Sequence, residues 1–453
     1  MTELEPHSLR TFTPTQAVLA KSAGVFHWTP EGRRLYDFSS GVLVANLGHN
    51  PTAWTKRLFE YMGWDHSIQT TTEEYFEATT LTAYNAVTNA EVEATRRLVE
   101  LMRARAGGSR MEQVMCAASG SEAIQKALWC SLARDPARDM IIATRYGFHG
   151  KKGLAGAVTG TEQDHDRDPR VKFISFPMCE RIDVSQRDEP FDVGCYLHEL
   201  KQLKHQFGRR LGTLITEPYL GGGGSYHPRK QYLQALEQFC REKDINFILD
   251  EIQSNFGRTG KLFAYETYGI EPDVVVLGKG LANGIPVAAA VGLREVIGAL
   301  GYGEGSDTWS AATLSCAGVL ATLDEFAARD VIAHTNKVSS IIEEGLIALK
   351  QLPFINYVRG EKGGMVWGVE ACDYSDRSAN EWANQIVLSC YSGEDHQGIH
   401  LLGPLAGKVV RIAPPLTITE TQAKESLALM NRLLEPLARE HAPSSSELAS
   451  MHS

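Results

Sequence analysis

Lys279 is the residue whose surroundings best suit covalent chemistry. It follows an apolar, β-branched run at residues 274–277 and stands between Gly278 and Gly280. Such a run is typical of a buried strand, so the amine is expected where water is scarce. Partial desolvation lowers the pKa of an ammonium group from about 10.4, and the neutral amine can form a Schiff base with a carbonyl. This stretch alone is also compatible with a surface lysine in a glycine-rich turn.

Two other apolar runs end in residues that could bind a ligand. Residues 246–249 lead into Asp250, and a carboxylate at the end of a buried strand costs free energy unless it has a partner. A protonated ring nitrogen would be such a partner, although Asp250 could instead cap the next loop. Residues 113–117 lead into Gly120 and Ser121 at the start of a predicted helix, where free N–H groups and the helix dipole suit a phosphate. Ser121 could equally be an ordinary helix cap.

Strand-like and helical patterns alternate through the middle of the chain, which predicts an α/β fold with a mostly parallel sheet. In such sheets ligands bind at the carboxyl ends of the strands, so Gly120, Asp250 and Lys279 are expected at one edge. A phosphate site, a carboxylate for a ring nitrogen and an imine-forming lysine are the three contacts that pyridoxal 5′-phosphate needs. The predicted strands are residues 113–117, 140–143, 171–176, 211–216, 246–249, 274–277 and 288–292.

Composition and charge narrow the class of protein. The 453 residues are enough for two or three domains. The net charge of −10 argues against a nucleic acid or a membrane as partner. The eight cysteines are scattered and form no Cys-x-x-Cys pair, which is typical of reduced thiols in a cytoplasmic protein. The polar N-terminus does not resemble a signal peptide, no apolar run is long enough for a membrane span, and the histidines show no metal-ligand spacing.

Patterns at the two ends of the chain predict its organisation. Residues 25–28 and 34–38 predict a β-hairpin. Residues 90–105 predict a helix with Asn89 as its N-cap and with Glu93 and Arg97 spaced to pair. The expected organisation is an N-terminal arm and part of a small domain at residues 1–60, a large cofactor-binding domain at 61–318, the C-terminal part of the small domain at 319–440 and a disordered tail at 441–453.

Several motifs occur in an order that resembles the class III aminotransferases, the ω-aminotransferase-like group of pyridoxal-phosphate enzymes. The resemblance extends from residue 24 to residue 436. It implies fold type I, an α/β architecture in which a large domain has a mostly parallel seven-stranded sheet and a smaller α/β domain is built from both chain ends. The motifs are Asp37-Phe38 to Gly41 with Asn46-Leu47-Gly48-His49, Ser119-Gly120-Ser121-Glu122-Ala123, Tyr146-Gly147-Phe148-His149-Gly150, Glu217-Pro218, Asp250-Glu251-Ile252-Gln253 to Gly257-Arg258-Thr259-Gly260, Lys279-Gly280, Thr308 and Arg411-Ile412-Ala413-Pro414-Pro415-Leu416.

The resemblance implies two catalytic residues. Lys279 forms the Schiff base with the cofactor and later moves the proton between the substrate carbon and the cofactor. Asp250 keeps the pyridine nitrogen protonated, so that the ring acts as an electron sink. The implied cofactor-binding residues are Gly120, Ser121, Phe148, His149, Glu217, Asp250, Ile252, Gln253, Lys279 and Thr308.

Individual contacts follow from the same resemblance. Phe148 stacks on one face of the ring and Ile252 on the other, while Gln253 hydrogen-bonds the ring hydroxyl. His149 orients a loop beside the cofactor. Thr308 reaches the phosphate of the neighbouring subunit's cofactor, so a homodimer with shared sites is expected.

The substrate side of the site is implied by two further residues. Arg411 resembles the arginine that binds the substrate carboxylate, for which a planar guanidinium is well suited. Glu217 resembles the glutamate that pairs with this arginine when an ω-amine occupies the site. The chain departs from the family at Ser254 and Asn255, where a small residue and a glycine are usual. Because asparagine tolerates left-handed backbone angles, the turn is expected to survive.

Together these features predict a pyridoxal-phosphate-dependent aminotransferase that works by a ping-pong scheme. An amine or ω-amino acid gives its amino group to the cofactor, and an oxoacid, pyruvate or 2-oxoglutarate, then takes it. The alternatives are a decarboxylating transaminase or an aminomutase on the same scaffold, or a cofactor-binding protein without turnover. The sequence does not specify the donor, the oxoacid, the stereochemistry or an assembly beyond the dimer.

Overall fold

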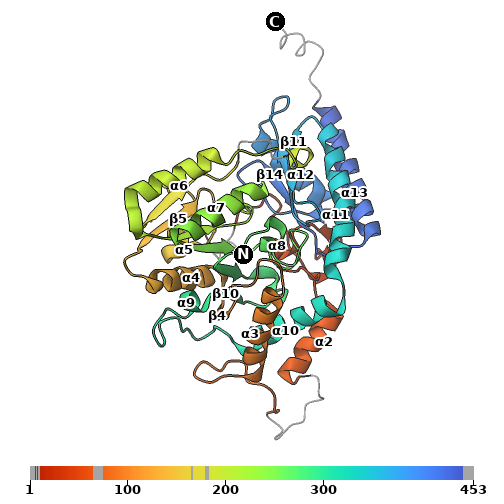
Figure 1. The fold of residues 1–453 in the computed structure, drawn as a ribbon. Coiled ribbons are helices and arrows are strands. Elements are labelled where there is room, and N and C mark those ends of the chain that lie inside the picture. The colour runs from red at the N-terminus through yellow and green to blue at the C-terminus, as the bar shows by residue number, and fades with distance from the viewer. Residues whose placement is uncertain are drawn as a thin grey trace.

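A seven-stranded sheet lies at the centre of the protein (Figure 1). Its strand order is β4-β10-β9-β8-β7-β5-β6, and every neighbouring pair is parallel except the two pairs that involve β10. The strands are β4 (Gln113–Ala117), β5 (Met140–Thr144), β6 (Val171–Ile174), β7 (Leu211–Thr216), β8 (Asn246–Asp250), β9 (Val274–Leu277) and β10 (Ala288–Gly292). The computed structural model describes residues 6, 8, 11–64, 75–164, 167–178 and 183–441.

All seven strands predicted from the apolar runs are present, which confirms the predicted mostly parallel sheet. Four of them, β4, β7, β9 and β10, have the predicted bounds. The other three differ by one or two residues at their carboxyl ends, so that Asp250 is the last residue of β8 and not the first residue after it.

Helices cover both faces of this sheet. Successive residues of a strand point to opposite sides, so a strand that is apolar throughout has to be covered on both faces. On β8, Phe247 and Leu249 belong to the same core cluster as residues of α3, α6, α7, α8 and α10, whereas Ile248 belongs to the cluster with α4, α5 and α9. A sheet buried on both faces is encoded by continuous apolar runs, which is the pattern seen in the sequence. These helices are α3 (Asn89–Arg103), α4 (Gly120–Arg134), α5 (Gly153–Ala157), α6 (Gly194–Phe207), α7 (Lys230–Lys243), α8 (Ala264–Tyr268), α9 (Arg294–Ile297) and α10 (Thr313–Ala328).

Helix α3 was predicted at residues 90–105; it begins one residue earlier and ends two residues earlier, and its predicted cap is wrong. The N-cap is Thr88, whose hydroxyl accepts the N–H of Glu91, while Asn89 is the first helical residue. The expected pairing of Glu93 with Arg97 is also wrong. Arg97 instead pairs with Asp324 of α10 at 2.7 Å, because α3 and α10 pack against each other.

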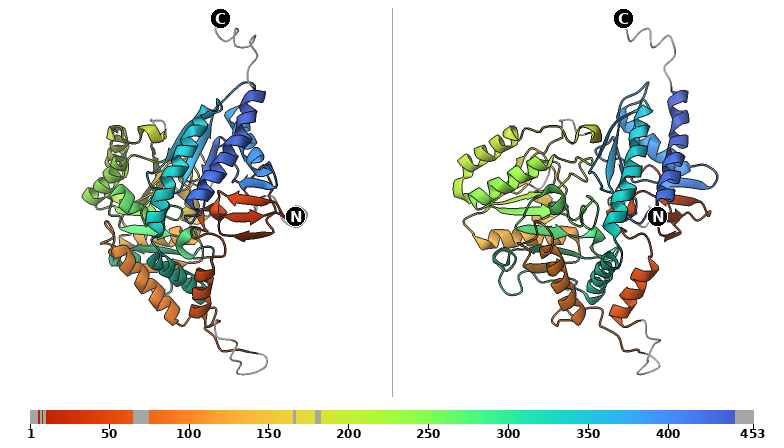
Figure 2. Two further views of the ribbon diagram at one scale, coloured as in Figure 1. Left: turned by 90° about the vertical axis from the view of Figure 1, so that its right-hand side faces the viewer. Right: turned by 45° about the vertical axis from the view of Figure 1, so that its right-hand side comes forward.

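The two ends of the chain meet in a second unit (Figure 2). The predicted hairpin is present as β2 and β3, and β13 from the C-terminal part pairs in parallel with β3. This pairing confirms a smaller α/β unit built from both chain ends. Its elements are β1 (Lys21–Ala23), β2 (Phe26–Trp28), β3 (Arg34–Asp37), β11 (Ile355–Gly360), β12 (Trp367–Ala371), β13 (Gln397–His400), β14 (Val409–Ile412), α1 (Ser40–Leu43), α2 (Thr52–Met62), α11 (Val331–Ala348), α12 (Ala379–Ser392) and α13 (Glu420–Glu440).

The predicted domain boundaries remain predictions. Helix α10 runs through the expected boundary at residue 318 and packs against both α2 and α3, so the junction is a continuous helix. Of the predicted disordered tail, only His441, at the end of α13, lies within the described residues.

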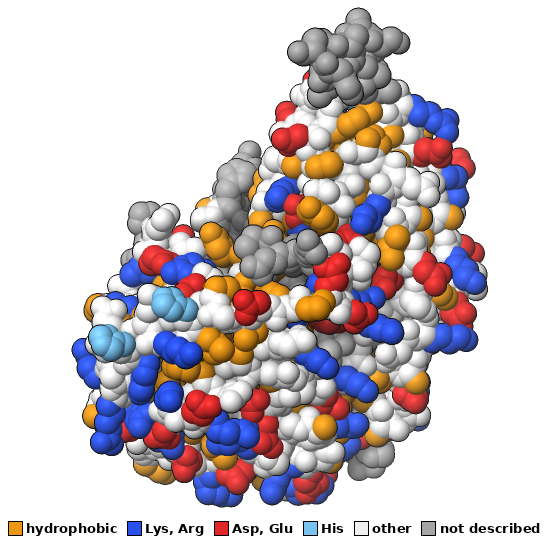
Figure 3. Space-filling model, turned by 45° about the horizontal axis from the view of Figure 1, so that its top comes forward, with side chains coloured by type: hydrophobic (Ala, Val, Ile, Leu, Met, Phe, Trp, Pro, Cys, Tyr) orange, Lys and Arg blue, Asp and Glu red, His pale blue; other side chains and the backbone are white. Residues whose placement is uncertain are grey.

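The surface carries charges of both signs. On the face in Figure 3, Lys and Arg side chains are interspersed with Asp and Glu side chains. Among the residues that the structure describes, no helix combines the length and the apolar composition needed to cross a membrane.

Candidate active site

Six strands present their carboxyl ends at the same edge of the large sheet. Strands β5, β6, β7, β8 and β9 are mutually parallel, and β4 has the same direction because both it and β9 are antiparallel to β10. The segments that leave these ends carry most of the predicted site residues. The structure therefore brings to one edge residues that lie up to 159 positions apart, from Gly120 to Lys279.

Lys279 follows β9 and Gly278, and it begins a short 3₁₀ turn. Its φ of 43° lies in the left-handed region, which costs a non-glycine residue free energy and is concentrated at functional sites. Burial lowers the pKa of its amine below the ordinary value, and although nearby Asp250 opposes the shift, the net change is a decrease. This is the direction that the sequence predicts.

Asp250 is held in place from both of its oxygens. Oδ2 lies 2.7 Å from Nδ1 of His149, and Oδ1 accepts the backbone N–H of Ile252 at 3.0 Å. Both Asp250 and His149 are buried. The other ring nitrogen of His149, Nε2, has no hydrogen-bond partner within the described part of the chain. His149 therefore positions Asp250 directly, whereas the sequence suggested only that it orients a loop.

Glu251, the neighbouring carboxylate, has a structural role. Its two oxygens accept the backbone N–H groups of Ala264 and Tyr265 at 2.7 Å each, at the start of α8. Burial raises the pKa of this carboxyl to about 8. The expected left-handed turn residue is also corrected here, because the positive φ of 50° falls on Phe256 and not on Asn255.

The start of α4 forms the predicted phosphate end of the site. Ser119, and not Ser121, is the N-cap, and it makes a reciprocal capping box with Glu122. The hydroxyl of Ser121 is therefore not used as the cap. The loop after β5 approaches it closely, since a Cβ built on Gly150 would lie 2.7 Å from Oγ of Ser121.

The predicted ring contacts come from two sides of this edge. Ile252 packs between strand ends: a Cβ on Gly120 would lie 2.9 Å from its Cδ1, and a Cβ on Gly278 would lie 3.3 Å from its Cγ2. Phe148 lies on the loop after β5 and is about half exposed. Gln253 points at the loop after β7, and its buried Oε1 has no hydrogen-bond partner among the residues described.

Glu217 follows β7 and faces the loop that carries Phe148. Its Oε1 accepts the N–H of Phe148 at 2.8 Å, and its Oε2 accepts the N–H of Gly221 at 3.1 Å. Burial raises the pKa of this carboxyl to about 7; His149 opposes the rise, and Asp250 adds to it. The backbone contacts use both oxygens, and the structure contains no ion pair between Glu217 and Arg411, both of which are described.

Arg411 lies on β14 and is 4% exposed. Burial lowers the pKa of its guanidinium, while Tyr219 and Glu217 act in the opposite direction. Its Nε has no hydrogen-bond partner in the described segments. A buried guanidinium with unused donor capacity suits a carboxylate ligand.

Tyr219 was not predicted from the sequence, and it lies close enough to Arg411 for their charges to interact. The phenol is 1% exposed, its hydroxyl has no partner among the described side chains, and its ring stacks on His227 at 4.5 Å. Its position directly after Glu217-Pro218 was the available signal.

Thr308 stands apart from the other predicted residues. It is exposed, on the loop between α9 and α10. The loop is held by Lys126 of α4, which binds Asp307 at 2.6 Å and Ser310 at 2.8 Å. A role for Thr308 toward a second subunit stays a prediction.

The family profile described as aminotransferase class-III matches residues 9–434. The chain belongs to the class III aminotransferases. This class III aminotransferase is 27% identical to the acetylornithine aminotransferase of Oceanobacillus iheyensis, with 97% of each chain covered. It is 26% identical to the 4-aminobutyrate aminotransferase of Escherichia coli, with 90% of this chain and 91% of the relative covered. A solved amine transaminase from an uncultivated Pseudomonas species, in its PLP-bound form, has a similar fold, with a TM-score of 0.78, 22% identity, and 95% and 96% of the two chains covered.

The protein is accordingly a pyridoxal-phosphate-dependent aminotransferase of fold type I, which transfers an amino group from an amine donor to an oxoacid. The residues at the sheet edge fit this cofactor. A buried carboxylate, an unpartnered amide oxygen on Gln253 and a lysine with a lowered pKa meet the start of α4.

Proposed function

We propose that Lys279 is the catalytic lysine and that the residues around it hold pyridoxal 5′-phosphate through the contacts predicted from the sequence. The observation that carries this proposal is the lowered pKa of the Lys279 amine at the edge where β8 ends in Asp250 and α4 begins. The cofactor, when bound, supplies an aldehyde for a Schiff base and a ring that withdraws electrons from the reacting carbon. Lys279 would supply the amine that bonds to the cofactor and would hold and move the proton at its own Nζ.

Asp250 would hold a proton on the ring nitrogen. Its hydrogen bond to His149 and its backbone contact to Ile252 fix the carboxylate before the ring arrives. The N–H groups at the start of α4, with Gly120 and Ser121, would bind the phosphate. These assignments rest on positions at one sheet edge and on the chemistry of the groups there.

The remaining predicted contacts complete the cofactor site. Ile252 and Phe148 would contact opposite faces of the ring. Gln253 would use its unpartnered amide oxygen to accept a hydrogen bond from the ring hydroxyl.

On the substrate side, Arg411 would bind the carboxylate of the oxoacid, pyruvate or 2-oxoglutarate, because its guanidinium is buried and its Nε is unpaired within the described residues. An amine donor without a carboxylate near the reacting carbon would need Arg411 to be neutralised. Glu217 is suited to this by its proximity, but it would first have to release the N–H of Phe148 or Gly221. The switch would fail if Glu217→Ala left the kinetics of amine donors and of oxoacids equally unchanged.

We further propose a homodimer in which Thr308 reaches the phosphate of the neighbouring subunit. Its exposure on this chain leaves it available for such a contact. A cytoplasmic location is proposed from the seven free cysteines among the described residues.

Replacing Lys279 tests the central assignment. Lys279→Ala should abolish steady-state turnover with every donor, because no other amine takes over the transfer. Lys261→Ala, the same change at an exposed lysine, is the matched control and should retain activity. Turnover at the wild-type rate in Lys279→Ala would refute the proposal.

A screen of amine donors against pyruvate and 2-oxoglutarate, followed by the spectral change of the cofactor, would define the donor and the acceptor. Transamination requires an oxoacid in every turnover cycle. Sustained turnover without any oxoacid would instead indicate an aminomutase, and release of carbon dioxide would indicate a decarboxylating transaminase.

A further inference from the structure

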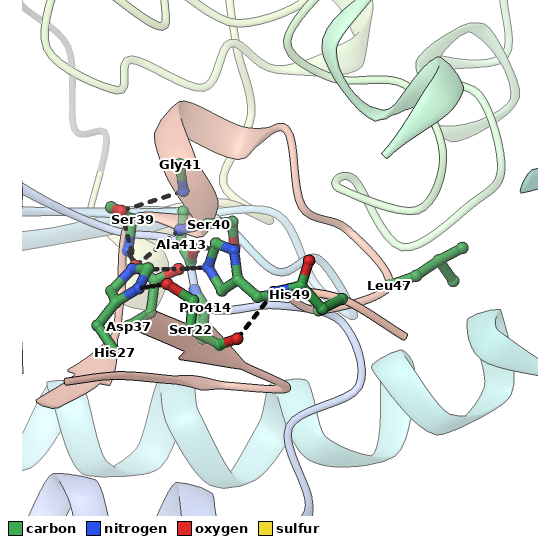
Figure 4. Close-up of polar contacts among 12 residues, drawn as sticks. Ser22, His27, Asp37, Ser39, Ser40, Gly41, Leu47, His49, Ala413 and Pro414 are labelled. Carbon is green, nitrogen blue, oxygen red and sulfur yellow. Dashed lines mark hydrogen bonds and ion pairs between the residues drawn. The ribbon is translucent and has the colours of Figure 1, made fainter. Parts of the chain in front are cut away.

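Three side chains of the N-terminal sheet form a cluster that amino-group transfer does not use. His27 on β2, Asp37 at the end of β3 and His49 in the loop after α1 place one nitrogen or oxygen atom each within 4.8 Å of one another. Figure 4 shows the two imidazole rings on either side of the Asp37 carboxylate. We call these three residues the His–Asp–His cluster.

The distances within the His–Asp–His cluster are short. Nε2 of His49 lies 2.7 Å from Oδ2 of Asp37, and Nε2 of His27 lies 3.4 Å from the same oxygen. Both imidazoles therefore face the same oxygen of one carboxylate.

One nitrogen of this cluster, Nε2 of His27, has only the 3.4 Å contact with Asp37. His27 is 3% exposed, and its Nε2 has no hydrogen-bond partner in the parts of the chain that the structure describes. The 3.4 Å contact with Asp37 is too long or too poorly aligned to count as a hydrogen bond. A buried polar atom without a partner costs free energy, and this one points at a carboxylate that a second imidazole already contacts.

We propose that the His–Asp–His cluster binds one divalent transition-metal ion, with Zn²⁺ as the reference ion, through Nε2 of His27, Nε2 of His49 and Oδ2 of Asp37. Two imidazoles and a carboxylate are a ligand set that zinc and neighbouring first-row ions accept. Water fills the fourth position. The proton shared by His49 and Asp37 leaves to solvent when the ion binds.

Two of the three distances between ligand atoms are close to those around a tetrahedral ion. Ligand atoms about 2.0–2.1 Å from a tetrahedral zinc ion lie about 3.3–3.4 Å from each other. The His27–Asp37 contact already has this length, and the His49–Asp37 contact has to lengthen by about 0.7 Å, the difference between 3.4 and 2.7 Å.

The surrounding hydrogen bonds are those that orient metal ligands. Nδ1 of His27 lies 2.6 Å from Oγ of Ser22, which fixes the ring with Nε2 toward Asp37. Oδ1 of Asp37 accepts the hydroxyl of Ser39 at 2.6 Å and two backbone N–H groups, leaving Oδ2 for the ion. The side chain of His49 is 16% exposed beside Gly41, which provides an entry path.

The bound ion would stabilise one wall of the substrate pocket. The segment that starts at Asp37 is tied to the segment after Arg411, since Ser40 Oγ donates to the carbonyl of Ala413 at 2.7 Å and the N–H of Ala413 donates to the carbonyl of Phe38 at 2.8 Å. This cluster could not be predicted from the spacing of the histidines in the sequence, because its three ligands come from separate segments.

Zinc content of the holoenzyme tests the proposal without using activity. Wild-type protein is stripped with a chelator, dialysed against micromolar ZnCl₂ and measured by elemental analysis. The matched control is His205→Gln, the same change at an exposed histidine of α6. Wild type and His205→Gln should each retain one more zinc ion per chain than His27→Gln. Zinc bound to thiols or to the cofactor is common to all three proteins and therefore cancels in this comparison.

Two further measurements keep the test decisive if His27→Gln is unstable. His49→Gln, at the more exposed ligand, should also lose one zinc ion per chain. Zn²⁺, but not Mg²⁺, should raise the thermal unfolding midpoint of wild type and of His205→Gln by the same amount. Equal zinc content in wild type and both cluster variants would overturn the proposal, as would an unchanged midpoint of wild type with Zn²⁺.

Discussion

Replacing Arg411 with lysine keeps a positive charge on β14 but removes the planar fork that suits a carboxylate. Arg411 is 4% exposed, and its Nε has no hydrogen-bond partner among the described residues. A lysine from the same backbone position offers a single ammonium group, so it cannot make two parallel hydrogen bonds to one carboxylate. The variant therefore separates charge from geometry at this position.

The expected loss follows from one charge-assisted hydrogen bond. Such a bond contributes about 1.5–3 kcal/mol, and each 1.36 kcal/mol is a tenfold change in rate. Arg411→Lys should therefore lower kcat/KM for pyruvate or 2-oxoglutarate by about 10- to 150-fold. An acceptor of similar size without a carboxylate, such as propanal, cannot use the fork and should change by less than about threefold.

The assay is the second half-reaction alone, in which the amino form of the enzyme is mixed with each acceptor and the cofactor absorbance is followed. This removes the amine donor from the comparison. A similar loss with pyruvate and with propanal would mean that Arg411 supports the fold of the site and does not bind the carboxylate. An unchanged rate with both acceptors would refute the assignment as well.

Three further variants test the electrostatics and the packing. Glu217 has a pKa of about 7 in the folded protein, and its ordinary value is 4.5. The folded protein therefore holds this proton more tightly than the unfolded chain does. The stabilisation is complete below pH 4.5, and the free energy of unfolding falls as the pH rises to 7. Glu217→Gln should therefore gain stability relative to wild type by up to about 3 kcal/mol between pH 5 and pH 8, and equal thermal shifts at the two pH values would contradict the raised pKa. Arg258 is fully buried and donates to one side-chain oxygen and two carbonyl oxygens, so Arg258→Lys should lower the free energy of unfolding by about 2–4 kcal/mol, measured by denaturant titration. Trp382 is fully buried and stacks on Phe354 at 4.2 Å; Trp382→Ala should cost about 3–5 kcal/mol in the same titration, and a loss below 1 kcal/mol would show that the core closes around the gap.

The seven strands of the large sheet, and the side chains near their carboxyl ends, could be predicted from the sequence to within one or two residues. Continuous apolar runs are local signals, and a residue at or just after the end of one, such as Asp250 or Lys279, is at the sheet edge whatever the strand order. The direction in which the pKa of Lys279 is shifted could be predicted for the same reason. The shift comes from the burial of the amine, and that burial follows from the apolar strand directly before it. The motif order was then sufficient to indicate the family, and the family match confirms it.

The tertiary structure alone decided which of these groups meet. His149 contacts Asp250 from 101 residues away, and Glu217 accepts the N–H of Phe148 where the sequence suggested a partner in Arg411. Arg97 likewise pairs with a residue of α10 and not with its neighbour on α3. Each of these contacts depends on strand order and helix packing, which local composition does not encode. The His–Asp–His cluster also depends on tertiary structure. Its three residues show no metal-ligand spacing in the sequence, and they meet only when the hairpin and the loop after α1 fold together.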